Sequence, residues 1–477
     1  MPGTPGPGGE LRRPDRAGGK AHPWQGGADL PRRPRAVPGP LQPARGRALP
    51  LPDRGRGGVA ERAHGLFLYA SGRDHGHPSH RASPRRSPVS SRKRFDAPGG
   101  SYAGAFPVAT PGCTNRRPSD TKGDIRVTSP AILKGASNKL DLRKLVEHLL
   151  DGEDLSPEEA RLSMYALTDS DENDALKAGF LIALRSKGES ADELCGFVRG
   201  MLELGQGPLR SRPAALADTC GTGGDGSRSF NISSAAAILV AALGIPVAKH
   251  GNRSVSSDCG SADLFEALGV SFATSPDDAT KRLEKLGFVF LFAPTFHPAT
   301  AAVAPVRRAL GVRTVFNVLG PLVNPARPSH QLIGAFDPQV ARQMARALSG
   351  LGVERAFCIH GEPGWDEATP VGEFLCVQVQ GEEIEEGVLD PRSFGVERCK
   401  PEDLLGGDAR ENVELCLRIF GGEKGPLFDA VALNTALVLL LTGKERDPKA
   451  AFRAASAPLE DGRALAYLNG LVGQDRS

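Results

Sequence analysis

The spacing of apolar side chains divides the chain into three stretches. Residues 1–137 show no sustained apolar periodicity, residues 138–210 repeat apolar side chains at helical spacing, and from 214 to about 362 short apolar runs alternate with helical segments. Such alternation predicts parallel strands joined by crossover helices. We therefore expect an extension, then a small all-helical domain, then a larger α/β domain over 211–477 with a mostly parallel central sheet.

Local signals set the expected limits of the helices in the second stretch. Ser156 is a predicted N-cap with Pro157 at the first helical position, and Ser170 or Asp171 should cap the next helix, which ends near Gly188. No catalytic constellation occurs here, so packing or dimerisation is the expected role. Four leucines of the first helix are expected to share one face: Leu142, Leu145, Leu149 and Leu150.

Polar segments stand at the ends of four predicted strands of the third stretch. The strands are "AALADTC", "IPVAKHG", "FVFLFAP" and "RAFCIHG", and the polar segments are "GTGGDG", "KHGNR", "FHPA" and "HGEPGWDE". The carboxyl ends of parallel strands lie along one edge of an open sheet, where ligands bind. The sequence therefore predicts an active-site cleft at this edge.

The glycine-rich segment favours a phosphate ligand. Gly221, Gly223 and Gly224 allow the backbone to approach phosphate oxygens with its N–H groups, next to the start of a predicted helix. The letters also satisfy G-x-G-x-x-G, a weak pattern by itself. A dinucleotide site expects an acid at the end of the next strand, where this chain has Lys249 and His250. A simple glycine-rich turn remains the alternative.

The segment after the second strand supplies further donors. Lys249 would meet a phosphate as a point charge, and Ser254, Ser256 and Ser257 would donate hydrogen bonds to it. A solvated surface loop is the alternative interpretation.

Two acids and two arginines complete the candidate chemistry. Asp366 and Glu367 are adjacent carboxylates of the kind that Mg²⁺ prefers, and Asp225 could assist them; alone, such a pair is usually solvated surface. Arg307 and Arg308 lie in a largely apolar segment, where an unmatched charge is costly. One of them is expected to face an anionic ligand and the other to face solvent.

Charge and cysteine usage exclude several classes of protein. Residues 1–123 hold 22 of the 59 basic and 8 of the 56 acidic residues, so 37 basic and 48 acidic residues remain in the body. An acidic body argues against a nucleic-acid surface. The eight scattered cysteines form no CxxC or Cys/His cluster, which suggests a reducing compartment. The longest apolar run, "ALVLLL", is too short to span a bilayer, so no membrane association is expected.

The first stretch, rich in Pro, Gly, Ser and Arg, has little to bury and is expected to be disordered or not native coding sequence. Three interpretations stay open. It resembles an organellar transit peptide, it could be a basic arm that binds nucleic acid, or it is upstream DNA translated from a start assigned too early. A start assigned too early predicts a cytoplasmic protein, whereas a transit peptide predicts an organellar one.

The motifs taken together resemble the anthranilate phosphoribosyltransferase family of tryptophan biosynthesis. The resemblance covers about 138–475 and rests on "DTCGTGGDG", "NISS", "KHGNRSVSS", "GSADLFEALG", "FHPA", "APVRRALGVRTVFNVLGPLVNP" and "HGEPGWDEAT". It implies a helical domain joined to an α/β domain, a homodimer, and Mg²⁺-dependent transfer from 5-phosphoribosyl 1-diphosphate (PRPP) to anthranilate, with two Mg²⁺ ions per subunit. It implies no nucleic-acid or membrane partner.

The resemblance also assigns roles to single residues. Asp366, Glu367 and Arg307 would be the catalytic residues, and Ser233 would join the two acids in binding Mg²⁺. Anthranilate would contact Gly221, Asn252, His297 and Arg307, with His250 on the same side. PRPP would be bound by Gly221, Gly224, Asp225, Ser229, Asn231, Ser233, Ser234, Lys249, His250, Gly251, Asn252, Arg253, Ser254, Val255, Ser256, Ser257 and Ser261.

The sequence departs from the family pattern at two positions. Asp258 stands where the family usually has Lys or Arg, which puts an acid beside a phosphate loop, and "NISS" replaces the more usual "NIST". Other functions remain open: a nucleoside phosphorylase of the same fold, a phosphoribosyltransferase for another aromatic amine, and a non-catalytic relative that binds nucleic acid. The KHGNR segment and Arg307 argue against the first two, and the acidic body argues against the third.

Overall fold

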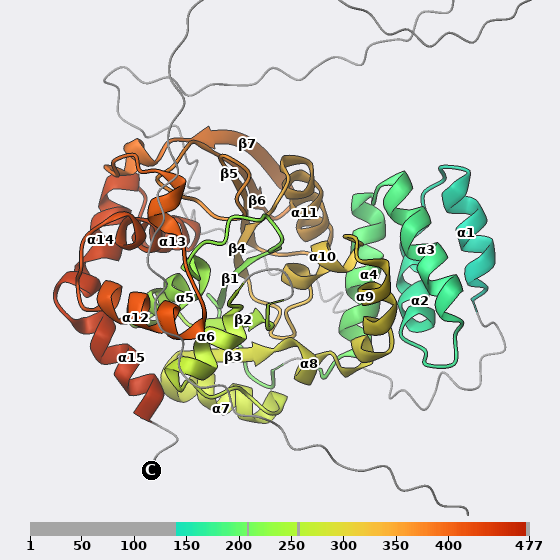
Figure 1. Ribbon diagram of the computed structural model, residues 1–477, viewed down its shortest axis with the longest axis horizontal. Helices are drawn as coiled ribbons and strands as arrows, with labels where there is room; N and C mark the ends of the chain where they lie inside the picture. The colour runs from blue at the N-terminus through green and yellow to red at the C-terminus, as the bar shows by residue number, and fades with distance from the viewer. Residues whose placement is uncertain (1–139, 208, 255–257, 474–477) are drawn as a thin grey trace, which may run out of the picture. The chain divides into compact units, whose positions relative to one another are not determined.

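The computed structural model describes residues 140–207, 209–254 and 258–473, and the expected extension over 1–137 lies outside them. A small helical domain comes first, followed by an α/β domain built on one sheet (Figure 1). The helical domain consists of α1 (Leu142–Leu150), α2 (Pro157–Leu167), α3 (Asp174–Lys187) and α4 (Ala191–Leu204).

Helix caps explain where the helices of the first domain begin. Ser156 caps α2 as predicted, and Glu159 completes a capping box with it. The predicted cap of α3 was wrong by two or three residues: Asn173, not Ser170 or Asp171, accepts from the N–H of Ala175 at 2.8 Å, because its side-chain oxygen directly precedes the first helical turn.

The first helix buries three of the four expected leucines. Leu142, Leu145 and Leu149 are buried, whereas Leu150 is 65% exposed, so the expectation that all four share one face was wrong for Leu150. Leu150 directly follows Leu149 at the end of the helix, and one step turns a side chain about 100° away from its neighbour at 3.6 residues per turn.

The central sheet has seven strands in the order β3-β2-β1-β4-β5-β6-β7. The first five are parallel, as expected, and β6 and β7 add an antiparallel edge that was not singled out from the sequence. β4 was missed too, although it occupies the centre. The strands are β1 (Ala217–Gly221), β2 (Val247–Gly251), β3 (Phe288–Phe292), β4 (His330–Gly334), β5 (Arg355–Gly361), β6 (Phe374–Gln380) and β7 (Glu383–Leu389).

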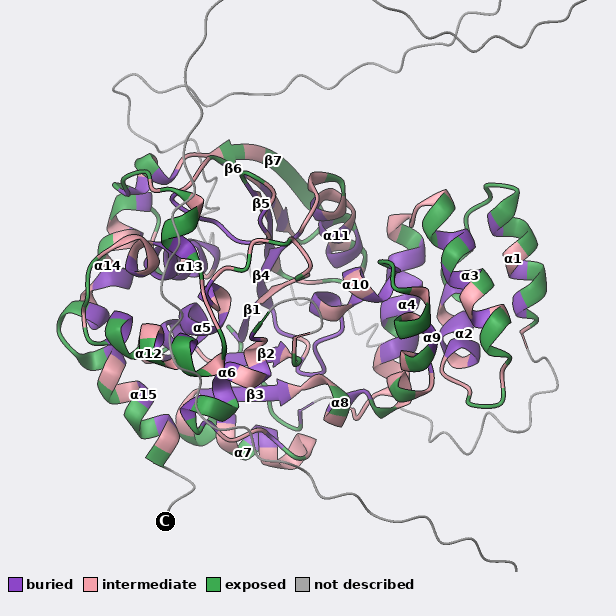
Figure 2. Ribbon diagram, in the orientation of Figure 1, coloured by how far each residue is buried: buried purple, intermediate pink, exposed green. Residues whose placement is uncertain are grey.

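Alternate residues of the strands enter two different cores. Phe357 and Ile359 of β5 face the core that contains α5 (Ile232–Ala242) and α13 (Pro426–Leu441), whereas Ala356 and Cys358 face the core that contains α11 (Pro338–Gly350) and α4. Both α5 and α13 are buried along most of their length (Figure 2), which matches their nearly uniform apolar composition. Helices thus cover both faces of the sheet, and the parallel direction of β1 to β5 puts the carboxyl ends of these strands at one edge.

The remaining helices connect or cover the strands (Figure 1). Among the described residues, no helix is both long and apolar enough to cross a bilayer. These helices are α6 (Ser261–Leu268), α7 (Pro276–Leu286), α8 (Ala293–Phe296), α9 (Ala304–Leu310), α10 (Phe316–Leu319), α12 (Ala409–Phe420), α14 (Pro448–Glu460) and α15 (Arg463–Gly473), with 3₁₀ turns at Pro298–Ala302, Gly320–Leu322, Pro391–Phe394 and Pro401–Leu404.

Candidate active site

The segment after β1 presents free backbone amides. Gly223, Gly224 and Gly226 have φ values of 65°, 71° and 76°, which side-chain-bearing residues rarely adopt. Within the described part of the chain, the N–H groups of Gly224, Asp225 and Gly226 form no hydrogen bond. Three consecutive unpaired donors beside the start of α5 suit an anion, and phosphate above all.

The two acids after β5 contact this segment directly. The N–H of Gly223 donates to Oδ2 of Asp366 at 2.7 Å, and the N–H of Ser233 donates to Oε1 of Glu367 at 3.0 Å. The N–H of Asp366 donates to Oδ2 of Asp225 at 3.3 Å. Loops that lie some 140 residues apart in the chain therefore meet at the carboxyl ends of β1 and β5, although β4 separates these two strands.

Gly334, at the end of β4, lets the acid loop cross above it. A Cβ atom at this position would lie 1.4 Å from the backbone oxygen of Asp366, far inside the contact distance. A side chain here would push the acid loop away from the glycine segment.

The substitution Gly334→Ala should therefore destabilise the protein by about 2 kcal/mol, as overpacking does elsewhere, and displace Asp366. Chemical denaturation measures this. Gly179→Ala is the matched control: Gly179 lies on the exposed side of α3, and a methyl group added there would meet nothing within 4 Å, so alanine should add up to about 1 kcal/mol of stability. Equal stability of Gly334→Ala and wild type would contradict the close approach.

Burial and mutual repulsion raise the pKa values of the acids. Burial, followed by the charge of Asp225, raises the pKa of Asp366 to about 7. Burial and the neighbouring Asp366 raise the pKa of Glu367 well above its usual range. The carboxylates repel one another and the charge of Lys249 offsets this only in part, so a divalent cation would relieve the repulsion.

The donor set fits Mg²⁺ in its chemistry. In the described residues, no group of three His, Cys, Asp or Glu side chains is placed to hold one ion. Asp366 and Glu367 with the hydroxyl of Ser233 make a smaller set of hard oxygen donors, and Mg²⁺ is commonly held by one or two carboxylates with waters and substrate phosphates. These residues would hold the ion.

The end of β2 and the loop after it border the glycine segment, but several of their side chains are turned toward the protein. Lys249 is buried, and its ammonium donates to the backbone oxygen of Thr219. Arg253, expected to bind PRPP, pairs with Asp263 at 2.9 Å and Glu266 at 2.7 Å on α6. The positive charge of Arg253 is thus already paired with two carboxylates in this structure.

Other residues of this loop stabilise its fold. Asn252 is exposed, and its backbone oxygen accepts from the hydroxyl of Ser261 at 3.3 Å. Gly251 has no room for a side chain, since a Cβ would lie 2.2 Å from that hydroxyl, and the N–H of Ser254 donates to Asp263 at 3.2 Å. The predicted positions Val255, Ser256 and Ser257 lie outside the described residues.

Asp258, the departure from the family pattern, has a partner. Its Oδ2 accepts from Nη2 of Arg228 at 2.7 Å and from Nε at 3.3 Å. Arg228 belongs to the glycine segment and has a φ of 54°. This ion pair joins the segments after β1 and β2, and it neutralises the acid that the sequence placed beside a phosphate loop.

Arg228→Ala should raise the KM for PRPP about threefold, because an unmatched acid then repels the diphosphate through a partly screened interaction. The swapped variant Arg228→Asp/Asp258→Arg restores the pair and should recover most of the loss. Steady-state kinetics at low ionic strength measures both variants. A swap that is as impaired as Arg228→Ala would argue against the pairing.

Three further predicted residues surround the start of α5. Asn231 donates to the backbone oxygen of Cys259 at 3.0 Å and accepts from Asn412 at 2.9 Å, so both ends of its amide are engaged by the protein. Ser229 lies 3.5 Å from Oε2 of Glu367, and Ser234 is buried. The structure thus gives Asn231 a supporting role.

Two buried histidines stand at the end of β2 and after α8. The rings of His250 and His297 are 5.3 Å apart and nearly perpendicular. Each bonds one backbone oxygen, of Gly320 at 3.1 Å and Val323 at 2.8 Å, and leaves its other ring nitrogen without a partner. Burial lowers the pKa of His250 to about 3 and lowers that of His297, so both rings are neutral at physiological pH.

The two arginines of α9 differ in burial, as expected. Arg308 is exposed, whereas Arg307 is half-buried with its guanidinium 4.9 Å from the ring centre of Phe316. Burial lowers the pKa of Arg307, and no carboxylate of the described chain pairs with it. A desolvated, unmatched cation of this kind favours an anionic ligand.

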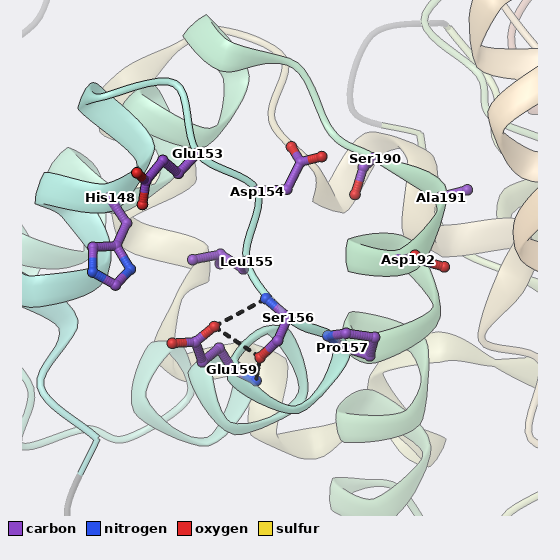
Figure 3. Close-up of a pocket in the computed structure, with 10 residues that line it drawn as sticks. All are labelled: His148, Glu153, Asp154, Leu155, Ser156, Pro157, Glu159, Ser190, Ala191 and Asp192. Carbon is purple, nitrogen blue, oxygen red and sulfur yellow. Dashed lines mark hydrogen bonds between the residues drawn. The ribbon is translucent and has the colours of Figure 1, made fainter.

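A separate pocket of about 550 Å³ lies in the helical domain (Figure 3). Its carboxylates serve local structure: Glu159 accepts from the N–H and hydroxyl of Ser156, and Asp154 pairs with Lys187. An acidic lining does not suit a diphosphate. The lining residues are His148, Glu153, Asp154, Leu155, Ser156, Pro157, Glu159, Ser190, Ala191 and Asp192.

Two arginines that hold the glycine segment were missed from the sequence, one within the segment and one in another loop. Arg228 pairs with Asp258, and Arg313 donates to the backbone oxygen of Gly224. Both are exposed arginines in loops: Arg228 stands among polar residues, and Arg313 lies in the same largely apolar segment as Arg307 and Arg308. Only the three-dimensional contacts distinguish them from ordinary surface charges.

The fold and the site define a class of protein. A helical bundle domain joined to an α/β domain is the two-domain arrangement of a glycosyl transferase family. The model of its helical bundle domain matches residues 143–205, and the model of its a/b domain matches residues 213–465.

Relatives narrow the class to one family. The anthranilate phosphoribosyltransferase of Methanosarcina acetivorans is 43% identical over 328 residues, which cover 69% of this chain and 88% of the relative. That of Desulforudis audaxviator is 44% identical over 331 residues, 69% of this chain and 95% of the relative. The chain belongs to the anthranilate phosphoribosyltransferase family and is a glycosyltransferase enzyme.

Solved structures of the same family agree in fold. The enzyme of Thermus thermophilus is 44% identical and superposes with a TM-score of 0.65 over 70% of this chain and 99% of its own. The Saccharomyces cerevisiae enzyme in complex with PRPP and Mg is 26% identical, with a TM-score of 0.62 over 69% and 96%. The same enzyme in complex with 4-fluoroanthranilate superposes with a TM-score of 0.61.

Proposed function

We propose that the protein transfers the phosphoribosyl group of PRPP to the amino nitrogen of anthranilate with Mg²⁺, giving N-(5-phosphoribosyl)anthranilate and diphosphate in tryptophan biosynthesis. The observation that carries the proposal is the meeting of the free amides of residues 224–226 with Asp366 and Glu367 at one sheet edge. The yeast relative's complexes with PRPP and Mg and with 4-fluoroanthranilate support it.

The amine of anthranilate needs no strong base, because an aromatic amine is neutral at pH 7. The barrier lies in breaking the glycosidic bond, as positive charge grows on the ribose and negative charge on the departing diphosphate. The amides of Gly224, Asp225 and Gly226 are pre-oriented donors for that negative charge. Bound Mg²⁺ would supply Lewis-acid stabilisation of the same oxygens.

Arg307 and Asn252 place the second substrate. The unmatched guanidinium of Arg307 would bind the anthranilate carboxylate, and the neutral rings of His250 and His297 would line the same side. Holding the amine in line with the breaking bond lowers the entropic part of the barrier. Asp366, Glu367 and Ser233 would hold the two Mg²⁺ ions of each subunit.

Assembly and location are part of the proposal. The helical domain would form a homodimer, and the enzyme would act in the cytoplasm. Light scattering on the purified full chain measures the first: a dimer mass is expected, and a monomer at micromolar concentration would contradict it.

Anthranilate fluorescence tests the reaction directly. Full-length protein mixed with anthranilate, PRPP and Mg²⁺ should consume the fluorescence, and omission of PRPP or addition of a chelator should stop the loss. A parallel sample with a pyrimidine nucleoside and inorganic phosphate tests the phosphorylase alternative. Nucleoside cleavage without loss of anthranilate would overturn the proposal.

A further inference from the structure

Arg313 is an exposed arginine that contacts two other parts of the molecule. It lies between α9 and α10, after Gly311 ends α9 at a φ of 62°. Its backbone oxygen accepts from Nη1 of Arg185 on α3, and α3 lies beside α9 (Figure 1). Its own Nη2 donates to the backbone oxygen of Gly224.

The side chain of Arg313 is held in place by an aromatic ring. Its guanidinium carbon lies 4.1 Å from the ring centre of Phe336, a cation–π distance. The N–H of Phe336 in turn donates to the hydroxyl of Thr222 at 3.1 Å, and the N–H of Thr222 donates to Gly334 at 3.0 Å. Arg313 and Thr222 thus fasten the glycine segment to the end of β4.

The bond from Arg313 sets the orientation of one peptide unit. A trans peptide holds its C=O and N–H on opposite sides. The C=O of Gly224 and the N–H of Asp225 belong to the same planar unit, so the bond that Arg313 makes to this carbonyl also sets where the N–H of Asp225 points. That N–H is one of the three unpaired donors of the segment.

We propose that Arg313 is a positioning residue for the diphosphate loop: its guanidinium fixes the Gly224–Asp225 peptide so that the Asp225 N–H is presented to the leaving group, and Arg185 anchors Arg313 from the helical domain. The kinetic part of this inference rests on the proposed function. The conformational part does not, because it concerns the loop without ligand.

Kinetics separates positioning of the diphosphate from other roles. Arg313→Ala should raise the KM for PRPP about tenfold, while the KM for anthranilate stays within about twofold of wild type, since one charge-assisted hydrogen bond orients one donor. Arg313→Lys should recover part of the loss, and Arg185→Ala should raise the same KM about threefold. Arg308→Ala, an exposed neighbour on α9 outside the site, should match wild type.

Hydrogen exchange of the ligand-free full chain tests the loop itself. The hydrogen-bonded amides of Thr222, Gly223 and Ser227 should exchange faster in Arg313→Ala than in wild type or Arg308→Ala, with unchanged exchange in β4. Unchanged loop exchange, or equal rises in both KM values, would overturn the inference. If wild type failed to consume anthranilate, the proposed function would fall, whereas the exchange result would still decide the role of Arg313.

Discussion

Arg307→Ala should lower kcat/KM for anthranilate roughly 100-fold and leave PRPP binding within about twofold of wild type, because removing one partner of a desolvated charge pair costs several kcal/mol. The expectation comes from a half-buried guanidinium without a carboxylate partner in the described chain. Steady-state kinetics with each substrate varied in turn, and calorimetric titration with PRPP, measure the two effects.

A substrate change supplies the control for this variant. Aniline carries the amine but no carboxylate, so wild type and Arg307→Ala should use it at similar, low rates, as a double-mutant cycle requires. Arg308→Ala should behave as wild type with both amines. Equal loss of anthranilate and PRPP affinity in Arg307→Ala would refute the carboxylate-binding role.

The double variant Asp366→Asn/Glu367→Gln should lose Mg²⁺-dependent turnover by about 1,000-fold or more, since it removes the groups that stabilise leaving-group charge. Its stability at pH 8 should equal or exceed that of metal-free wild type. Folding raises the pKa of Asp366 from its usual 3.8 to about 7, so wild type loses stability as pH rises through that window, and neutral amides escape the penalty.

Thermal unfolding and activity of the same samples test this combination. Glu362→Gln, an exposed acid on the same loop, should change neither measurement. A double variant that unfolds at lower temperature and stays inactive would point to a structural role of the acids. Unchanged magnesium dependence would rule out their role in metal binding.

The sequence predicted the elements whose cues are local. Ser156 and Pro157 begin α2 as expected, Gly188 ends α3, and the parallel strands bring their polar ends to one edge. β4 was not singled out, because His330–Gly334 is short, begins with two polar residues and ends without a polar motif of its own. The strands β6 and β7 follow the polar segment "HGEPGWDE" and lie beyond residue 362, where the predicted alternation of strands and helices ends.

Contacts between distant segments could not be derived from one sequence. The ion pair of Arg228 with Asp258 and the bond from Arg313 to Gly224 depend on how loops of different strands meet. Arg253 illustrates the same limit: its place in the KHGNR segment suggests a phosphate ligand, whereas α6 presents Asp263 and Glu266 to it. The sequence shows which side chains carry a charge, but it does not show which residue each of them contacts.

A crystal structure of the wild-type protein with PRPP and Mg²⁺ tests the central claim most directly. The diphosphate should accept hydrogen bonds from the amides of residues 224–226, with the metal ion bound by Asp366 or Glu367. Diphosphate bound elsewhere, with these amides left to water, would contradict the account.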